Sequence, residues 1–138
     1  MKVLIDTCVI IDLLQKRTPF FYNAYSIFIG LANYQFEGFI TAKSVADIYY
    51  LMHHFLHDIT KTRKELDKLF KLFSVLDTTE LDCKKALHSN LSDYEDALMV
   101  ETALRCKIDC IITRNTKDFS KASIKIYSPE EFVNNFLL

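Results

Sequence analysis

An aspartate directly follows a run of aliphatic residues near the amino terminus. Val3, Leu4 and Ile5 form a segment suited to burial, and Asp6 comes next. An unpaired carboxylate is costly to bury, so this position calls for a compensating partner. Other carboxylates occupy similar places, where a strand is expected to end or a helix to begin. They are Asp47, Asp93, Asp96 and Asp118.

A cluster of carboxylates has a characteristic chemistry. Like charges at short range raise one another's pKa values, so such a cluster favours a bound cation. Ligands that are all oxygen suit Mg²⁺ or Mn²⁺. One or two such ions lower the pKa of water and bind both oxygens of an in-line displacement at phosphorus. The chemistry that fits these residues is therefore metal-dependent cleavage of a phosphodiester.

Short apolar segments alternate with stretches of helical periodicity. Strands are predicted at residues 2–6, 38–41, 75–76, 110–113 and 124–126. Helices are predicted at residues 7–14, 20–36, 45–56, 60–73, 80–88, 93–107 and 129–138. The alternation predicts an α/β layered fold with a mainly parallel sheet, in one domain over residues 1–138.

Several helix starts carry capping signals. Single N-cap residues are predicted at Thr7, Ser44 and Thr79. Ser92 with Glu95 predicts a capping box. The segment Ser128-Pro129-Glu130-Glu131 predicts a helix start with a cap, a proline at the first position and a glutamate at the third.

A parallel sheet brings its strand ends and the following helix starts to one rim. Ligands of such folds lie beyond the carboxyl ends of the strands. Asp6 ends the first strand, and Asp47 is expected in the first turn of the helix after the second. Asp93 and Asp96 are three residues apart and share a helix face. Asp118 follows the 110–113 strand.

Each acid taken alone is better explained as a helix cap or a partner of the helix dipole than as a catalytic residue. Their joint placement at one rim favours a site. Asp12 differs, because it falls inside the first helix, where we expect it to face solvent or a neighbouring base.

Three segments resemble the PIN domain family. They are the opening VLIDTCVIID, the later SDYEDAL and the closing IITRNTKDF, and together they span nearly the whole chain in the right order. The resemblance implies a small α/β/α sandwich with a parallel sheet of four to five strands. It also implies a Mg²⁺- or Mn²⁺-dependent ribonuclease, because many members have that activity. Many bacterial and archaeal members are VapC-type toxins paired with an antitoxin, so the resemblance implies such a pair as well.

The family's acidic positions map onto individual residues of this chain. The first aspartate matches Asp6, with Thr7 beside it as the supporting hydroxyl. The second acid, usually glutamate, matches Asp47, whose side chain is shorter. The third matches Asp96, and Asp93 is an additional acid on the same face. The fourth position is occupied by Asn115, so Asp118 is expected to supply that charge.

The resemblance and the chemistry imply the same division of roles. Asp6, Asp96 and Asp118 would hold the metal, with Asp93 as a further ligand. Asp47 would orient or deprotonate the attacking water. Ser44 and Thr113 are expected to donate hydrogen bonds behind the metal ligands. Arg114 is the candidate contact to a substrate phosphate.

Other clusters have competing explanations. The segment KTRKELDKLFK at residues 61–71 is either the solvated face of an amphipathic helix or a row of phosphate contacts for RNA.

The histidines and cysteines could in principle bind a metal. His53 and His57 lie one turn apart, but the HExxH zinc pattern fails because position 54 is histidine. The cysteines are Cys8, Cys83, Cys106 and Cys110; we expect them to be reduced, although Cys106 and Cys110 allow a pair or a metal site.

Bulk properties narrow the choice further. A net charge of −1 argues against binding nucleic acid by overall charge alone. No apolar stretch reaches membrane-spanning length, and the amino terminus does not suit a signal peptide, so a cytoplasmic protein is expected.

Three functions remain open from the sequence. The first is an endoribonuclease that acts as the toxin of a toxin–antitoxin pair. The second is a catalytically weak or inactive module that binds RNA or a partner protein, which the departures at Asp47 and Asn115 suggest. The third is a nuclease for structured DNA. Either core packing or a groove in which an antitoxin helix docks explains the aromatic and aliphatic residues Tyr22, Tyr25, Phe28 and Ile29. A homodimer is an expectation from the family alone.

Overall fold

Five parallel strands form the centre of the computed structural model, which describes residues 1–137. The sheet order is β3-β2-β1-β4-β5, and every neighbouring pair is parallel. The strands are β1 (Lys2–Ile5), β2 (Glu37–Thr41), β3 (Phe73–Leu76), β4 (Cys110–Ile112) and β5 (Lys125–Tyr127). The predicted parallel α/β fold is confirmed.

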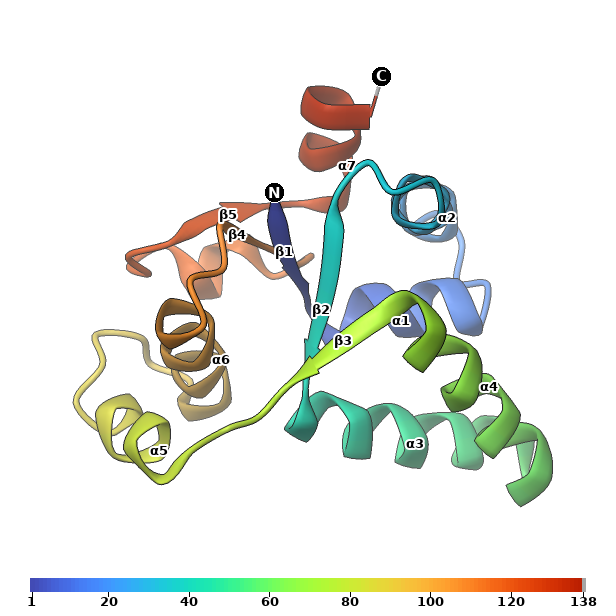
Figure 1. Ribbon diagram of the computed structural model, residues 1–138, viewed down its shortest axis with the longest axis horizontal. Coiled ribbons are helices and arrows are strands. Elements are labelled where there is room, and N and C mark those ends of the chain that lie inside the picture. The colour runs from blue at the N-terminus through green and yellow to red at the C-terminus, as the bar shows by residue number, and fades with distance from the viewer. Residues whose placement is uncertain (138) are drawn as a thin grey trace.

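Helices cover both faces of this sheet. Figure 1 shows α5 and α6 on one side and α1, α2 and α4 on the other, with α3 running from the end of β2. The helices are α1 (Thr7–Leu14), α2 (Phe21–Ala32), α3 (Ala42–Leu56), α4 (Ile59–Leu72), α5 (Glu80–Ala86), α6 (Tyr94–Arg105) and α7 (Pro129–Phe132). The 3₁₀ turn η1 (Thr116–Phe119) follows β4, and the π-helical turn η2 (Val133–Leu137) follows α7.

The core divides into two parts because side chains alternate across a strand. Val3 and Ile5 of β1 pack with α1, α2, α3 and α4, whereas Leu4 packs with Val100 of α6 and Phe119 of η1. All three strand residues are fully buried. Burial on both faces explains why the β1 segment is apolar throughout.

The strand order places a switch point between β1 and β4. The chain runs from β1 outward through β2 and β3, and then continues on the other side of β1 with β4 and β5. A crevice forms beyond the carboxyl ends of strands at such a point. Asp6 directly follows β1 and Thr113 directly follows β4, so both lie at this crevice.

Several predicted helix caps lie a few residues from the observed ones. Asp6, rather than Thr7, caps α1; Thr41, rather than Ser44, caps α3; and Asp93, rather than Ser92, caps α6. At α1 and α3 the side chain that accepts a helical N–H stands nearer the preceding strand than predicted, whereas at α6 it stands one residue nearer the helix. The starts at Thr79 and Ser128 are confirmed, the latter with its capping box and Pro129.

Some predicted bounds were also too long. The helix predicted at residues 20–36 ends at Ala32, because the chain must turn before β2 begins at Glu37. The helix predicted to residue 73 ends at Leu72, because Phe73 already pairs in β3. The carboxyl-terminal helix was predicted to residue 138, which lies outside the described residues; its α-helical part ends at Phe132. Across residues 1–137, every helix is too short or too polar to cross a membrane.

Candidate active site

A cleft of about 580 Å³ opens at the carboxyl edge of the sheet. The segments that follow β1 and β2, the start of α6 and the loop after β4 all contribute to its wall. Its acidic and amide residues are Asp6, Asp47, Asp93, Glu95, Asp96, Asn115 and Asp118. The five aspartates predicted from the sequence therefore line one cleft, although they are spread over more than a hundred positions of the chain.

Asp6 is held by three donors. Its Oδ1 accepts the Thr7 backbone N–H at 2.8 Å, and its Oδ2 accepts the Thr113 hydroxyl at 2.7 Å. The Cys8 thiol lies 3.7 Å from the same Oδ2. Burial raises the pKa of Asp6, and these hydrogen bonds counteract only part of that effect. The carboxylate after the aliphatic run is thus stabilised by two donors from α1 and one from the residue that follows β4.

A chain of hydroxyls supports this arrangement behind the cleft. The Thr7 hydroxyl donates to Ser44 Oγ at 3.1 Å, and the Thr41 hydroxyl does so at the same distance. The Asn115 backbone N–H donates to Thr113 Oγ1 at 3.1 Å. Thr41, Ser44 and Thr113 are buried. The hydroxyls expected to support the site thus lie together at the ends of β1, β2 and β4. Thr41 was not among the residues predicted from the sequence, although a helix start was predicted three residues later, at Ser44.

The acids of α6 repel one another. Asp93 caps the helix, its Oδ1 accepting the Asp96 N–H at 2.9 Å. Burial raises the pKa of Asp96 to about 6, together with repulsion from Asp93, Asp6, Asp118 and Glu95. Asp96 therefore stands in the negative field of four other carboxylates. A bound cation would relieve this repulsion.

The donor set of the cleft fits a hard divalent cation. It consists of carboxylates, one amide and hydroxyls, which are ligands for Mg²⁺ or Mn²⁺ and not for a soft metal. Within residues 1–137, no group of three or more His, Cys, Asp or Glu side chains is placed so that it could hold a metal ion together. An open arrangement suits Mg²⁺, which keeps several waters and usually takes only one or two protein carboxylates.

Asp47 occupies a different position from the one predicted. It lies in the second turn of α3, not the first, because α3 begins at Ala42. Its Oδ2 lies 2.6 Å from Nζ of Lys43, which also reaches Glu95 of α6 at 3.3 Å. Burial lowers the pKa of Lys43, but the hydrogen bonds to Asp47 and Glu95 outweigh it and raise that pKa. Lys43 was missed, and its spacing of four from Asp47 was the available signal.

Asp12 is buried against basic side chains, so the expectation that it faces solvent was wrong, whereas the alternative, that it faces a neighbouring base, is confirmed. Its side chain is 1% exposed, and Arg114 donates to both of its oxygens, from Nε at 2.6 Å and from Nη2 at 3.2 Å. Arg17 lies 4.0 Å away. The paired guanidinium offsets the cost of burying the carboxylate.

Arg114 is consequently committed to a contact inside the protein. Two of its nitrogens bind Asp12, and its guanidinium stacks over the Phe20 ring at 4.0 Å. Among the described residues, the cations that line the cleft are Arg17 and Lys43. A phosphate contact by Arg114 stays a prediction, and the cleft offers two other candidates for that role.

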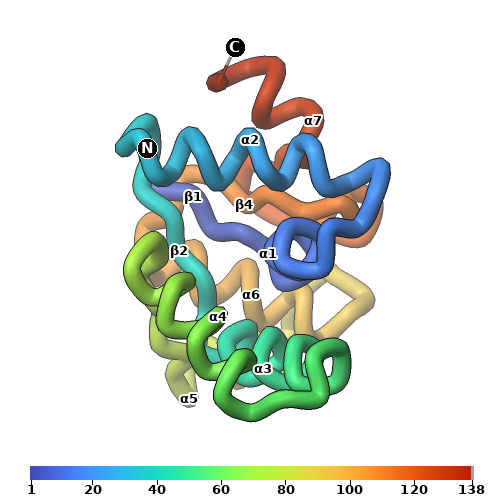
Figure 2. Tube along the Cα trace, turned by 90° about the vertical axis from the view of Figure 1, so that its right-hand side faces the viewer, coloured from blue at the N-terminus to red at the C-terminus, as the bar shows by residue number. Residues whose placement is uncertain are grey.

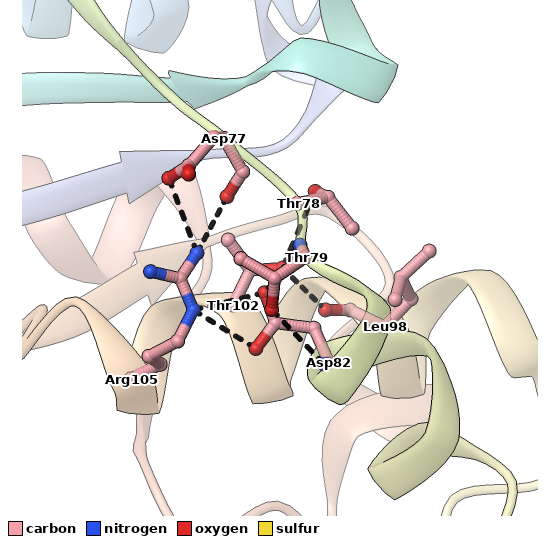
Figure 3. A network of polar contacts seen from close by, with 7 residues as sticks. All are labelled: Asp77, Thr78, Thr79, Asp82, Leu98, Thr102 and Arg105. Carbon is pink, nitrogen blue, oxygen red and sulfur yellow. Dashed lines mark hydrogen bonds and ion pairs between the residues drawn. The ribbon is translucent and has the colours of Figure 1, made fainter.

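A polar network fixes α6, the helix that carries Asp93 and Asp96. Figure 3 shows Arg105, in its last turn, bound to the segment that leads into α5. Arg105 Nε donates to both Asp82 oxygens at 3.0 Å, and its Nη2 donates to the Asp77 carbonyl at 2.7 Å. The hydroxyl oxygens of Thr102 and Thr78 are 3.4 Å apart, and Thr78 lines the cleft. The network orients α6 from the end opposite to its acids.

Comparison with known proteins places this fold in a family. The PIN domain family model matches residues 2–117, as the sequence motifs had predicted. No curated protein matches the chain.

Solved structures share the fold at low identity. A toxin–antitoxin complex from Klebsiella pneumoniae is 22% identical, with a TM-score of 0.68, over 92% of this chain and 97% of that one. VapBC2 from Rickettsia felis, bound to a promoter DNA fragment, is 14% identical, with a TM-score of 0.69, over 93% and 98%. FitAcB from Neisseria gonorrhoeae is 19% identical, with a TM-score of 0.68, over 93% and 98%. On the family match over most of its length, the chain belongs to the PIN domain family.

Proposed function

We propose that the protein is a metal-dependent endoribonuclease that cleaves RNA phosphodiester bonds, and that it is the toxin component of a toxin–antitoxin pair. The observation that carries the proposal is the convergence of carboxylates on Asp96, whose pKa they help to raise to about 6. Such repulsion at a switch-point crevice is typical of a functional site. The family consists largely of nucleases, which supports the assignment.

Asp6, Asp96 and Asp118 would hold Mg²⁺ or Mn²⁺, with Asp93 contributing the oxygen that is not used as a cap. The bound ion would supply a Lewis acid for the phosphate and lower the pKa of a nearby water. Thr113 and Thr7 hold Asp6 in place through its two oxygens. Asp47 faces the same cleft and would orient or deprotonate the attacking water, provided that Lys43 releases it.

Cleavage of RNA by the purified protein tests this proposal. We expect single-stranded RNA to be cut with Mg²⁺ or Mn²⁺, and to stay intact with a chelator. Asp6→Asn should abolish cutting while keeping the cap of α1, since asparagine caps as well as aspartate. Asp67→Asn, which removes an exposed carboxylate on α4, is the matched control and should cut normally. Equal cleavage by the Asp6→Asn protein would refute the proposal.

One observation favours a second candidate, a PIN-like module that binds RNA or a partner protein without cutting. Asp47 is engaged by Lys43 at 2.6 Å, and Asn115 stands at a position where the family has an acid. Calorimetry separates the two: an absence of divalent-metal binding with retained RNA binding would support the module. A DNA nuclease is distinguished from both candidates by testing cleavage of a panel of RNA and structured DNA substrates.

The partner proposal has its own test. The similar solved structures contain toxin–antitoxin assemblies, which supports an antitoxin partner for this chain. Expression in a bacterial host should arrest growth, and Asp6→Asn should not. Co-expression of a cognate antitoxin should relieve the arrest. A homodimer is proposed from the family alone, and sedimentation measures it directly.

A further inference from the structure

One face of α3 leads out of the cleft. Lys43, Asp47, Tyr50 and His54 are separated by four, three and four residues, so they lie in one line along the helix. The first three line the cleft. At 1.5 Å per residue, the line is roughly 16 Å long. We refer to these four side chains as the α3 line.

Tyr50 has the properties of a stacking platform. It is 70% exposed although it is large and lies beside the cleft. Its ring stacks on His54, with centroids 6.4 Å apart and planes 15° from parallel. Exposed rings of this kind stack unpaired bases, and every base offers such a face.

Cations stand at both ends of the α3 line. Lys43 has three N–H donors, of which Asp47 and Glu95 take two, so one is available. Beyond His54, α4 begins at Ile59 and packs beside α3 (Figure 2). Its first turns expose Lys61, Arg63 and Lys64, and none of these forms an ion pair with another residue of the described chain. A polyanion following the line would meet Lys43, which is paired with Asp47 and Glu95, on one side of Tyr50, and the unpaired cations of α4 on the other.

We propose that the α3 line binds a single-stranded RNA segment next to the phosphate that is cut, with Lys43 on a phosphate and Tyr50 stacked on a base. The inference rests on the proposed function and extends it by naming the residues that would hold the unpaired strand beside the cleft. A duplex keeps its bases stacked on each other, so it offers none to Tyr50. Stacking and phosphate contacts carry little sequence information, so this subsite selects unpaired RNA of any sequence.

The absence of tryptophan from the chain allows a direct test. In an Asp6→Asn background, which holds RNA uncut, Tyr50→Trp places a single fluorophore on the α3 line. A single-stranded RNA oligonucleotide with Mg²⁺ should quench it saturably. Tyr34→Trp is the control: Tyr34 is 94% exposed and precedes β2, at the opposite edge of the sheet. Its fluorescence should not change.

Affinities provide a second measurement in the same background. Tyr50→Ala should weaken single-stranded RNA binding about 5- to 100-fold, and Tyr34→Ala should not. Lys43→Met should weaken binding and reduce the salt slope by about 1. Binding of a duplex of the same sequence should be unaffected by Tyr50→Ala.

The outcomes distinguish this inference from the proposed function. If the wild-type protein cuts RNA, but Tyr50→Trp shows no quenching and Tyr50→Ala binds normally, the α3 line is refuted and the nuclease assignment stands. If Tyr50→Ala instead loses only binding to the antitoxin, the line is a protein interface and the inference is wrong. If the wild-type protein neither binds nor cuts RNA, both fail together.

Discussion

The hydroxyl of Thr113 donates a hydrogen bond to Asp6 Oδ2 at 2.7 Å, across the switch point between β1 and β4. The two residues are 107 positions apart in the chain, yet each directly follows its strand. The bond fixes the orientation of the carboxylate that the proposed metal would use. It also leaves Asp6 Oδ1 to the backbone of Thr7.

Replacing Thr113 by valine removes this donor and keeps the shape of the side chain. Hydrogen-bond partners of metal ligands typically contribute 10- to 100-fold to metal affinity or activity. We expect Thr113→Val to weaken Mg²⁺ affinity by about that factor, measured by calorimetry, and Thr113→Ser to restore most of it. Unchanged Mg²⁺ affinity in Thr113→Val would show that the hydroxyl does not support the metal site.

Asp96 should destabilise the metal-free protein. It stands in the field of Asp6, Asp93 and Asp118, and that repulsion is present only in the folded state. We therefore expect Asp96→Asn to raise the melting temperature at neutral pH in the presence of a chelator. Mg²⁺ at a hundred times its Kd should stabilise the wild-type protein by about 2.7 kcal/mol and the variant much less. Equal stabilisation of both would place the ion elsewhere.

We predict that the main role of the Asp12–Arg114 pair is to stabilise the folded protein. Arg114→Met leaves a buried carboxylate without its main partner, which typically costs about 3–5 kcal/mol. Arg17, at 4.0 Å, should keep the cost near the lower end. The double variant Asp12→Leu, Arg114→Met should recover most of the loss in urea denaturation. A fully stable Arg114→Met protein with weakened RNA binding would instead support the phosphate role.

The sequence was most informative where local pattern decides the structure. Uniformly apolar segments predicted buried parallel strands, and alternation with helices placed Asp6, Asp96 and Asp118 at one rim. Helix periodicity likewise located α4, whose observed bounds differ by one residue at each end. These features depend on the types of side chain within a short segment, so one amino-acid sequence is enough to predict them.

Contacts between distant segments could not be predicted in this way. Asp12 resembles any surface residue of a helix, and only the approach of Arg114, 102 positions later, makes its burial favourable. Lys43 contacts Glu95 because α3 and α6 flank one cleft, which no spacing in the sequence indicates. The cap of α6 is ambiguous locally, since Ser92 and Asp93 are both good caps.

The Arg105 network predicts an acid-dependent stability that is independent of the proposed metal site (Figure 3). Burial raises the pKa of Asp82, but hydrogen bonds from the Thr79 N–H, Arg105 and the Thr79 hydroxyl outweigh it and lower the pKa below its usual 3.8. The unfolded state therefore binds the proton more readily. The stabilisation is fully present above about pH 4 and is lost as the pH falls through the lowered folded-state pKa.

Melting curves of wild-type protein and Asp82→Asn, recorded with a chelator between pH 2.5 and 7, measure this effect. Asp82→Asn removes the charge that pairs with Arg105, so its melting temperature should be several degrees lower at pH 7. The two curves should converge as the pH falls through the lowered folded-state pKa of Asp82, because the wild-type carboxylate is then protonated as well. Asp67→Asn, at an exposed pair with Lys71, should follow the wild type at every pH. A constant offset between wild type and Asp82→Asn would mean that the network acts through shape and capping, and not through the charge of Asp82.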